Sequence, residues 1–298
     1  MDSLLSFLPI VGILSVSGIV AGFLAGLLGV GGGIIFVPVL TFVFGTIMHL
    51  DPSVAIMMAT ATSLVTMIPT TMSSCFSHYK KGNLDTNLLK RWFIFLMAGV
   101  ILGRVFAGLF GGLWLTILFG FIMLCAATNM MFFAKAKGIF NNLPSMLGQA
   151  MMAFLISSIS VMLGIGGGTL TVPTLSLFNV DTKKAVGTAS TIGMLVAVPG
   201  AITTIITDLS SGNTVANAPI MTVGHTNFLA ALCIIPFSIL MAPFGVKVNK
   251  MCQPHVIKRL FAILLIFTGL TAYDIQKIRA MDVDYEDKET TTKKAVAG

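Results

Sequence analysis

Long apolar stretches alternate with short polar interruptions along almost the whole chain. Gly, Pro, Asn and charged residues bound these stretches, most of which are near the length of about 20 residues that an α-helix needs to cross a bilayer. The pattern predicts an all-α, polytopic membrane protein with about ten transmembrane segments. The predicted segments are residues 8–28, 34–50, 54–76, 92–110, 113–134, 145–163, 169–180, 184–207, 225–243 and 256–274.

The composition agrees with a chain that is solvated by lipid. Of the 298 residues, 56% are hydrophobic and 10% are charged, and the mean hydropathy is +0.96. An average soluble domain has about a quarter of its residues charged, so a soluble globular fold is excluded. The predicted segments leave no room for an extramembrane domain, and any function must therefore lie between helices.

The positive charges predict an orientation. If all ten segments cross, the loops near residues 50–53, 110–113 and 208–224 fall on one side and carry no Lys or Arg. The positive-inside rule places the other, basic side in the cytoplasm of a cell (inner) membrane protein and both termini outside. The net charge of +7 therefore needs no nucleic-acid partner. The bases on the cytoplasmic side are Lys80, Lys81, Lys90, Arg91, Lys135, Lys137, Lys183, Lys184, Lys247, Lys250, Lys258 and Arg259.

The chain also repeats itself. Residues 29–40, GVGGGIIFVPVL, align with residues 164–175, GIGGGTLTVPTL, and residues 59–63 resemble residues 185–189 after a loop that is shorter by nine residues. Each half then holds five segments, and an odd number inverts the second half relative to the first. We therefore expect a first repeat over 1–140, a second, inverted repeat over 141–275 and a polar, flexible tail over 276–298.

The repeated motif contains two glycine runs that predict breaks between helices. Gly31, Gly32 and Gly33, and Gly166, Gly167 and Gly168, disfavour a continuous helix. Each following helix would start with free N–H groups and a positive dipole end, which bind anions. Segment 169–180 would span only about 18 Å, which places its glycine run within the membrane. Tight turns at the membrane surface are the alternative, and the depth of the first run stays open.

Hydroxyl side chains are dense in the segments that follow the glycine runs. Most are expected to bond to their own backbone four residues earlier. Thr62, Ser63, Thr188 and Ser190 lie nearest the breaks in the repeat alignment, and Thr169 directly follows the second run. We expect these five hydroxyls to contribute to a substrate-binding site for an oxyanion.

Arg104 is the one base deep inside a predicted segment. It lies about 20 Å along the helix from Arg91, so it either supplies a counter-charge to the substrate or extends toward the membrane surface. Asp51 and Asp208 are expected in solvated outer loops. The four His and four Cys residues are scattered without ligand-like spacing, so neither a metal, a cofactor nor a catalytic site is predicted.

These motifs resemble the TauE/SafE family of membrane transporters, the sulfite and organosulfonate exporters. The resemblance rests on residues 21–33, AGFLAGLLGVGGG, with Pro38, on the second copy from Leu163 to Pro173, and on residues 185–188, AVGT. It extends over about residues 8–275. Arg104 and Ala189 depart from the family pattern.

The resemblance implies export of a small sulfur-containing anion from the cytoplasm, and the repeats suggest alternating access between them. An anion channel and an intramembrane enzyme are the alternatives. The expected partners are the anionic substrate and the lipid bilayer, with a homodimer left open. The coupling ion cannot be read from the sequence.

Overall fold

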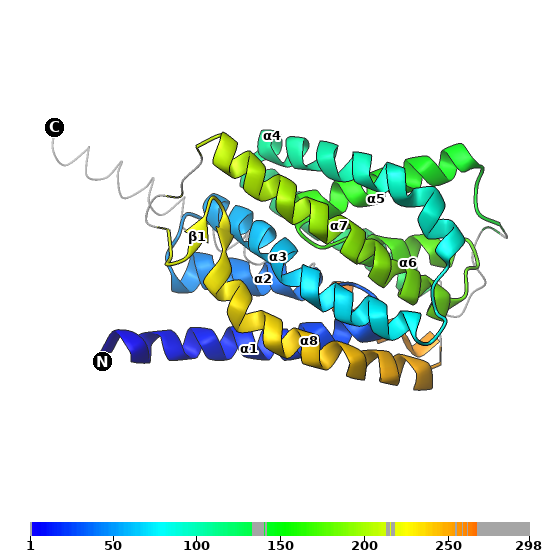
Figure 1. Cartoon of the computed structure of the whole chain (residues 1–298), viewed down its shortest axis with the longest axis horizontal. Helices are drawn as coiled ribbons and strands as arrows, with labels where there is room; N and C mark the ends of the chain where they lie inside the picture. Colours follow the sequence, from blue (N-terminus) through cyan, green and yellow to red (C-terminus); the bar gives the residue numbers. More distant parts are fainter. Residues whose placement is uncertain are drawn as a thin grey trace.

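Long apolar helices lie side by side along one common direction (Figure 1). The computed structural model describes residues 2–132, 140, 142–212, 215, 218–253, 255–257, 259–260 and 262–266. Its elements are α1 (Asp2–Leu28), α2 (Gly33–Phe42), the π-helical turn η1 (Val43–Ile47), α3 (Pro52–Tyr79), α4 (Thr86–Phe132), α5 (Met146–Leu163), α6 (Gly168–Leu177), α7 (Thr182–Ser210), the strands β1 (Thr222–Val223) and β2 (Thr226–Asn227), and α8 (Phe228–Met251).

The helices confirm an all-α, multi-pass membrane protein. Six helical stretches are long and apolar enough to cross a bilayer, and two shorter apolar helices cover Gly33–Ile47 and Trp114–Thr128. Large apolar side chains such as Leu109, Leu147 and Leu232 are exposed on the outside of the bundle, as expected where lipid is the solvent. The six stretches lie in Leu8–Leu28, Pro52–Tyr79, Thr86–Leu109, Met146–Leu163, Thr182–Ser210 and Phe228–Met251.

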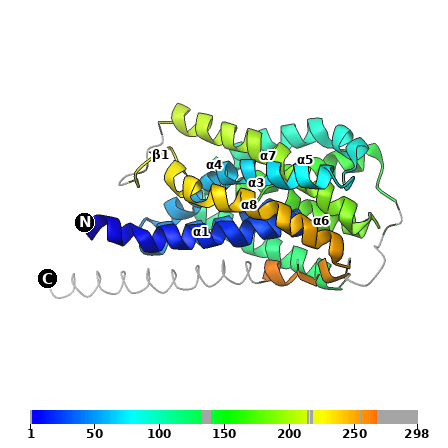
Figure 2. The same cartoon turned by 60° about the horizontal axis from the view of Figure 1, so that its bottom comes forward.

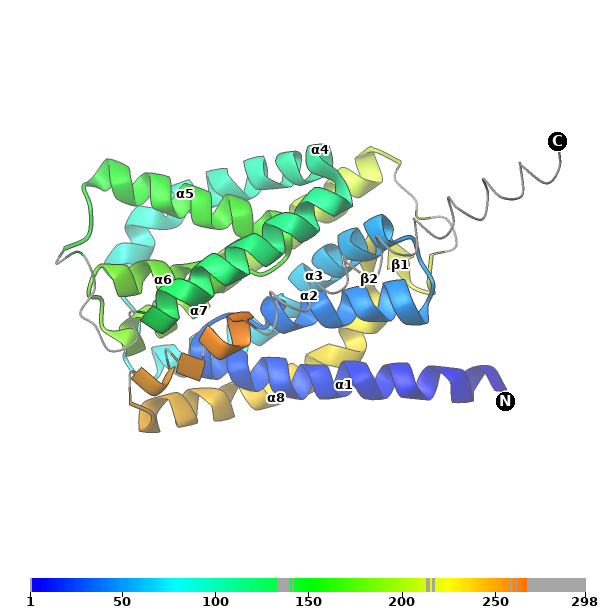
Figure 3. The ribbon, with the colours of Figure 1, turned by 180° about the vertical axis from the view of Figure 1, so that it is seen from behind.

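The predicted segments 92–110 and 113–134 form one 47-residue helix, α4, without a break in its helical backbone. A straight helix of this length would measure about 70 Å, but α4 turns back near its middle (Figure 3). Its first arm brings Arg104 to Asp208 at the end of α7. Its second arm returns toward the start of α7, where Met123 and Val186 belong to the same apolar cluster.

The two halves repeat the same local structure. The glycine runs precede two ten-residue helices, α2 and α6. The turn η1 then adds five residues in the first half, after which Asp51 and Asp181 cap α3 and α7 with the same backbone angles, φ −51° and ψ 130°. These caps align Ala59 with Ala189, so the predicted alignment of residues 59–63 with 185–189 was wrong by four residues.

Helices from the two halves pack against each other. The hydroxyls of Ser74 and Ser190 are 3.1 Å apart, and Cys75 Sγ is 3.2 Å from Thr191 Oγ1, while Leu64 lies near Gly200. This pairing makes α3 and α7 antiparallel neighbours. By contrast, α8 lies along α1 in the parallel direction, with Gly18 near Ile234 and Gly26 near Ala242, and α5 lies along α4 (Figures 1 and 2).

The described bases, with the exception of Arg104, gather at one end of the bundle. We call it the basic end and define it by residues 79–91, 183–184, 247–253, 255–257 and 259. Lys183 Nζ donates to the carbonyl of Lys250 over 3.1 Å. Desolvation, together with repulsion from Lys250 and Lys247, lowers the pKa of Lys81. Lys135, Lys137, Lys258, the boundary near residue 140 and the predicted tail 276–298 fall wholly or partly outside the described residues.

The opposite end carries a feature that the sequence did not reveal. The short hairpin β1–β2 lies there, together with the start of α3 and the end of α7 (Figure 1). We call it the hairpin end and define it by residues 50–52, 208–212 and 222–227. The predicted segment 225–243 therefore begins within this hairpin, and α8 starts at Phe228 and extends to Met251.

Candidate functional site

The glycine runs are breaks between helices, as predicted. The helix α1 ends at Leu28 and α2 begins at Gly33, and α5 ends at Leu163 before α6 begins at Gly168. Gly31 and Gly166 occupy equivalent places with φ values of +78° and +66°. This left-handed backbone is strained for other residues, and it allows the chain to leave one helix and start the next within four residues.

The two breaks meet beside Met67, which lies near the middle of α3. A methyl group added at Gly31 would be 2.6 Å from Met67 Cε, and one added at Gly166 would clash with the same atom. Because Met67 is far from both ends of α3, the breaks lie halfway through the bundle. This position does not fit the alternative of tight turns at the membrane surface.

Backbone from one break touches backbone from the other. A methyl group at Gly33 would lie 2.6 Å from the carbonyl oxygen of Gly164, and one at Gly168 would overlap the carbonyl oxygen of Gly29. Ser63 Oγ also donates to the carbonyl oxygen of Gly164. Thr169 Oγ1 lies 3.4 Å from the carbonyl oxygen of Val30. The structure therefore brings both runs, Ser63 and Thr169 into one buried cluster.

This central cluster has the electrostatic character of an anion site. The first N–H groups of α2 and of α6 have no acceptor within their own helices, and both helices direct a positive dipole end into the cluster. Among the described residues, Asp208 is the one buried carboxylate, and it belongs to the hairpin end. The centre therefore offers N–H groups without a competing negative charge, while the hydroxyls of Ser63 and Thr169 donate to backbone carbonyl oxygens.

Side chains from α3 and α8 satisfy the end of α1 inside the protein. The carbonyl oxygen of Ala25 accepts from Ser74 Oγ at 3.2 Å, and that of Gly26 accepts from His78 Nε2 at 2.9 Å. Asn249 Nδ2 donates to the carbonyl oxygen of Leu27 at 2.6 Å. Unsatisfied carbonyl groups are costly in a membrane, so these three side chains stabilise the first break.

The other predicted hydroxyls lie farther from the centre. Ser190 Oγ bonds to the carbonyl oxygen of Val186, one turn earlier, and to Ser74. Thr188 Oγ1 accepts from the backbone N–H of Asp85 at the basic end, over 3.0 Å. Thr62 Oγ1 accepts from the backbone N–H of Asn227 in the hairpin, also over 3.0 Å.

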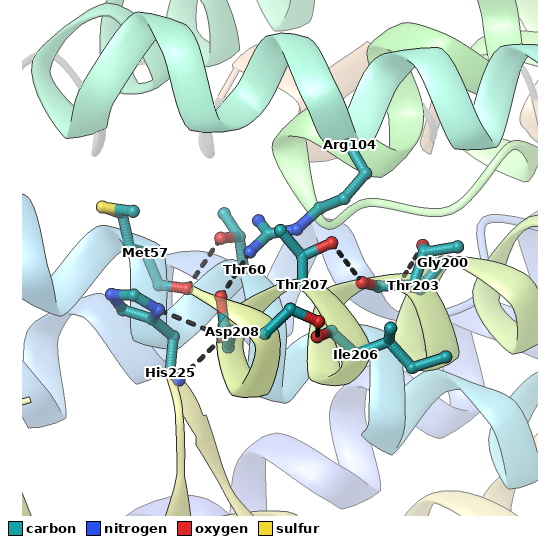
Figure 4. A network of polar contacts seen from close by, with 10 residues as sticks. Met57, Thr60, Arg104, Gly200, Thr203, Ile206, Thr207, Asp208 and His225 are labelled. Atoms are coloured by element: carbon teal, nitrogen blue, oxygen red, sulfur yellow. Dashed lines mark hydrogen bonds and ion pairs between the residues drawn. The ribbon is translucent and has the colours of Figure 1, made fainter. Parts of the chain in front are cut away.

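Arg104 forms an ion pair with Asp208, a residue that the sequence predicted in a solvated outer loop. Its Nη2 lies 2.6 Å from Oδ1 of Asp208, whose side chain is 1% exposed (Figure 4). The expectation that Asp208 lies in a solvated loop was wrong, because α7 extends to Ser210. Residues 188 and 208 are separated by about 30 Å of helix, so Thr188 and Arg104 cannot contact the same small anion.

A cavity beside the hairpin is apolar and lies away from the glycine runs. It holds about 310 Å³ and is lined mainly by apolar residues of α1, α8 and the loop before β1, including Leu14, Ile220 and Cys233. Such a surface gives a small oxyanion few hydrogen bonds. Across the described part of the chain, no group of three His, Cys, Asp or Glu residues could hold a metal ion.

The chain has long apolar helices and two interrupted ones, α1–α2 and α5–α6. This arrangement is typical of a multi-pass membrane transporter. Residues 14–272 match the family model of the sulfite exporter TauE/SafE, and the chain belongs to this family. The family and the names of its relatives denote transporters, which are not enzymes.

The names of three relatives state the class of protein, a membrane transporter, without a substrate. The probable membrane transporter protein YunE of Bacillus subtilis (strain 168) is 29% identical over 276 residues, which cover 86% of this chain and 95% of the relative. A probable membrane transporter protein of Haemophilus influenzae is 27% identical, with coverages of 86% and 95%. The probable membrane transporter protein MJ0441 of Methanocaldococcus jannaschii is 25% identical, with coverages of 89% and 96%. No solved structure matches the chain.

Proposed function

We propose that the protein is a secondary transporter that exports a small sulfur-containing anion, sulfite or an organosulfonate, by alternating access. The observation that carries this proposal is the meeting of the two glycine breaks beside Met67. There, two helix starts lie in a buried region that contains Ser63 and Thr169 and, among the described residues, no carboxylate. The sulfur-containing substrate comes from the family description, whereas the preference for an anion comes from the geometry.

We also propose that the two halves form inverted repeats of five crossings each, over 1–140 and 141–275, with ten crossings in all. The antiparallel contact of α3 with α7 supports this inversion. The turn in the middle of α4 supports two crossings by that helix. In such an arrangement, rocking of one repeat against the other exposes a shared central site to each side in turn.

An anion screen tests the substrate. We expect one anion among sulfite, thiosulfate, sulfate, sulfoacetate and sulfolactate to raise the thermal stability of the purified protein, because a ligand that binds only the folded state stabilises it by about 2.7 kcal/mol at a concentration of 100 Kd. The same anion should accumulate in proteoliposomes. Chloride at equal ionic strength is the control.

Two outcomes of the screen would contradict the proposal. If none of the five anions stabilises the protein or enters the vesicles, the substrate class is wrong. If an anion crosses and planar bilayers show single-channel currents, the protein is a channel rather than a carrier.

Cysteine labelling tests the orientation. Lys80→Cys at the basic end and Ser210→Cys at the hairpin end change two exposed positions at opposite ends of the bundle. The positive-inside rule predicts that an impermeant maleimide labels position 210 in intact spheroplasts and labels position 80 only after lysis. A variant in which Cys75, Cys125, Cys233 and Cys252 are replaced is the parent and control, and the reverse labelling pattern would contradict a cytoplasmic basic end.

A further inference from the structure

A buried group of three ionisable side chains joins three elements at the hairpin end. Asp208 near the end of α7 contacts Arg104 of α4 through Oδ1, at 2.6 Å. Its other oxygen, Oδ2, accepts from the backbone N–H of His225 at 2.9 Å and lies 3.1 Å from His225 Nδ1. The side chains of Arg104, Asp208 and His225 are 14%, 1% and 10% exposed, so water screens their charges poorly.

No other acidic or basic side chain faces this group from the described elements that pack against it. The stretches 52–77 of α3, 146–163 of α5 and 168–177 of α6 contain no Asp, Glu, Lys, Arg or His. The charges of α8, Lys247 and Lys250, lie at the basic end. The charge of this buried group is therefore set by Arg104, Asp208 and His225, whereas Asp51 at the same end is exposed.

The charge of these three side chains changes with one proton. With a neutral imidazole, the guanidinium and the carboxylate cancel, and the group has no net charge. One added proton, shared by the Asp208–His225 pair, leaves one net positive charge in a buried place. An uncompensated buried charge is costly, and an anion bound beside Arg104 removes that cost.

We propose that Arg104, Asp208 and His225 form a combined proton and anion site, so that transport of the anion is coupled to transport of a proton. This inference rests on the proposed anion transport. The proton neutralises the carboxylate that is paired with Arg104. The anion then takes the place of Asp208 as the partner of the guanidinium. The two ligands therefore bind together and cross in the direction that their combined gradient favours.

Unused hydrogen-bonding groups lie at the same place. Arg104 Nε is buried and has no hydrogen-bond partner among the described residues. Thr204, one helical turn before Asp208 on α7, is 1% exposed, and its Oγ1 also lacks a partner there. A guanidinium N–H and a hydroxyl are donors that an oxyanion accepts from, so a bound anion would satisfy groups that the protein leaves unpaired.

The hairpin links this site to the central cluster. His225 contacts Asp208, and two residues later the backbone N–H of Asn227 donates to Thr62 Oγ1 on α3. The next residue of α3, Ser63, donates to the carbonyl oxygen of Gly164. The hairpin and the Thr62–Ser63 pair thus connect Asp208 to the second glycine break. A change in the hydrogen bonds of Asp208 can act on the central site through these contacts.

Proteoliposomes that contain a pH-sensitive dye test the coupling. Sulfate, thiosulfate and sulfoacetate are suitable probes, because they take up no proton near neutral pH and any proton signal must come from the protein. With an imposed gradient of one of these anions, the wild-type protein should move protons in the same direction as the anion. Asp208→Asn combined with His225→Gln removes both groups that share the proton, and this double variant should abolish the proton signal.

The control is Asp51→Asn. Asp51 is an exposed aspartate at the same end, which caps α3 through the N–H of Ser53, and Asn is an equally good cap. This variant should keep both the anion flux and the proton flux of the wild type. Anion flux without proton flux in the wild type would overturn the coupling while leaving the proposed function intact, whereas no flux of any probe would overturn the proposed function and the coupling with it.

A binding measurement separates the coupling from the transport cycle. If one proton binds with one anion, the affinity of the wild-type protein for the anion should fall up to about tenfold for each unit of rising pH above the titration of the site. In the double variant Asp208→Asn, His225→Gln the affinity should not change between pH 6 and pH 8. Wild-type affinity that is equal at both pH values would overturn the proposal.

Discussion

Asp208→Ala is expected to destabilise the protein by about 3–5 kcal/mol. The change removes the carboxylate that lies 2.6 Å from Arg104 and leaves a mostly buried guanidinium unpaired. It also removes the acceptor of two contacts of His225, which loosens the hairpin from α7. Denaturant unfolding in detergent micelles measures this loss, and thermal unfolding should show a matching decrease in Tm.

A double variant shows how much of the destabilisation comes from the unpaired charge of Arg104 and how much from lost packing. Arg104→Met combined with Asp208→Leu replaces the ion pair by apolar side chains, and such replacements are often neutral or stabilising in buried positions. We therefore expect the double variant to be more stable than Asp208→Ala. Asp51→Ala, which loses one capping bond at the same end, should cost about 1 kcal/mol and serves as a control. If Asp208→Ala lowers the free energy of unfolding no more than this control does, the ion pair does not stabilise the protein.

The sequence predicted the fold well where a pattern is local. The ends of apolar stretches match the ends of α1 and α5, at Leu28 and Leu163, because a glycine run stops a helix whatever surrounds it. The number of crossings was harder to predict. Gly111 and Gly112 separate the predicted segments 92–110 and 113–134 near the middle of α4, but the helical backbone continues through them, and the described residues contain six stretches that meet the criteria for a span.

The candidate site shows the same limit. The glycine runs and their hydroxyl neighbours Ser63 and Thr169 could be predicted, because a break and its first helical turn are adjacent in sequence. Met67 could not be predicted, because an apolar residue in an apolar helix carries no signal. Its position between the two breaks follows only from the packing of α3 against Gly31 and Gly166.

Asp208 was missed for a different reason. A carboxylate near the end of an apolar stretch looks like a loop residue when its partners are unknown. Those partners, Arg104 and His225, are 104 and 17 residues away in sequence. The cap-based alignment offers one signal, since it pairs Asp208 with His78, the buried histidine near the end of α3. A polar residue at both equivalent positions indicates that each helix end is anchored inside the protein.

Gly168→Ala is expected to abolish transport and to destabilise the protein by about 1–3 kcal/mol. The added methyl group would overlap the carbonyl oxygen of Gly29 and lie 3.0 Å from that of Ala189. Both contacts are with backbone, which cannot rotate away as a side chain can, so the two breaks must separate. The start of α6 would then move relative to the start of α2. Anion flux into proteoliposomes and the unfolding midpoint measure the two effects.

Gly12→Ala is the matched control, because a methyl group there has no heavy atom within 4 Å. Gly12 lies within α1, where Ala favours the helix by up to about 1 kcal/mol, so this variant should keep its transport and its stability. A Gly168→Ala protein that remains folded gives the sharper comparison, because its anion-dependent thermal stabilisation reports on binding alone. Loss of that stabilisation in a folded variant ties the contact between the breaks to the anion site. Wild-type flux in Gly168→Ala would show that the two breaks can separate without affecting transport, and the central cluster would no longer be a candidate for the site.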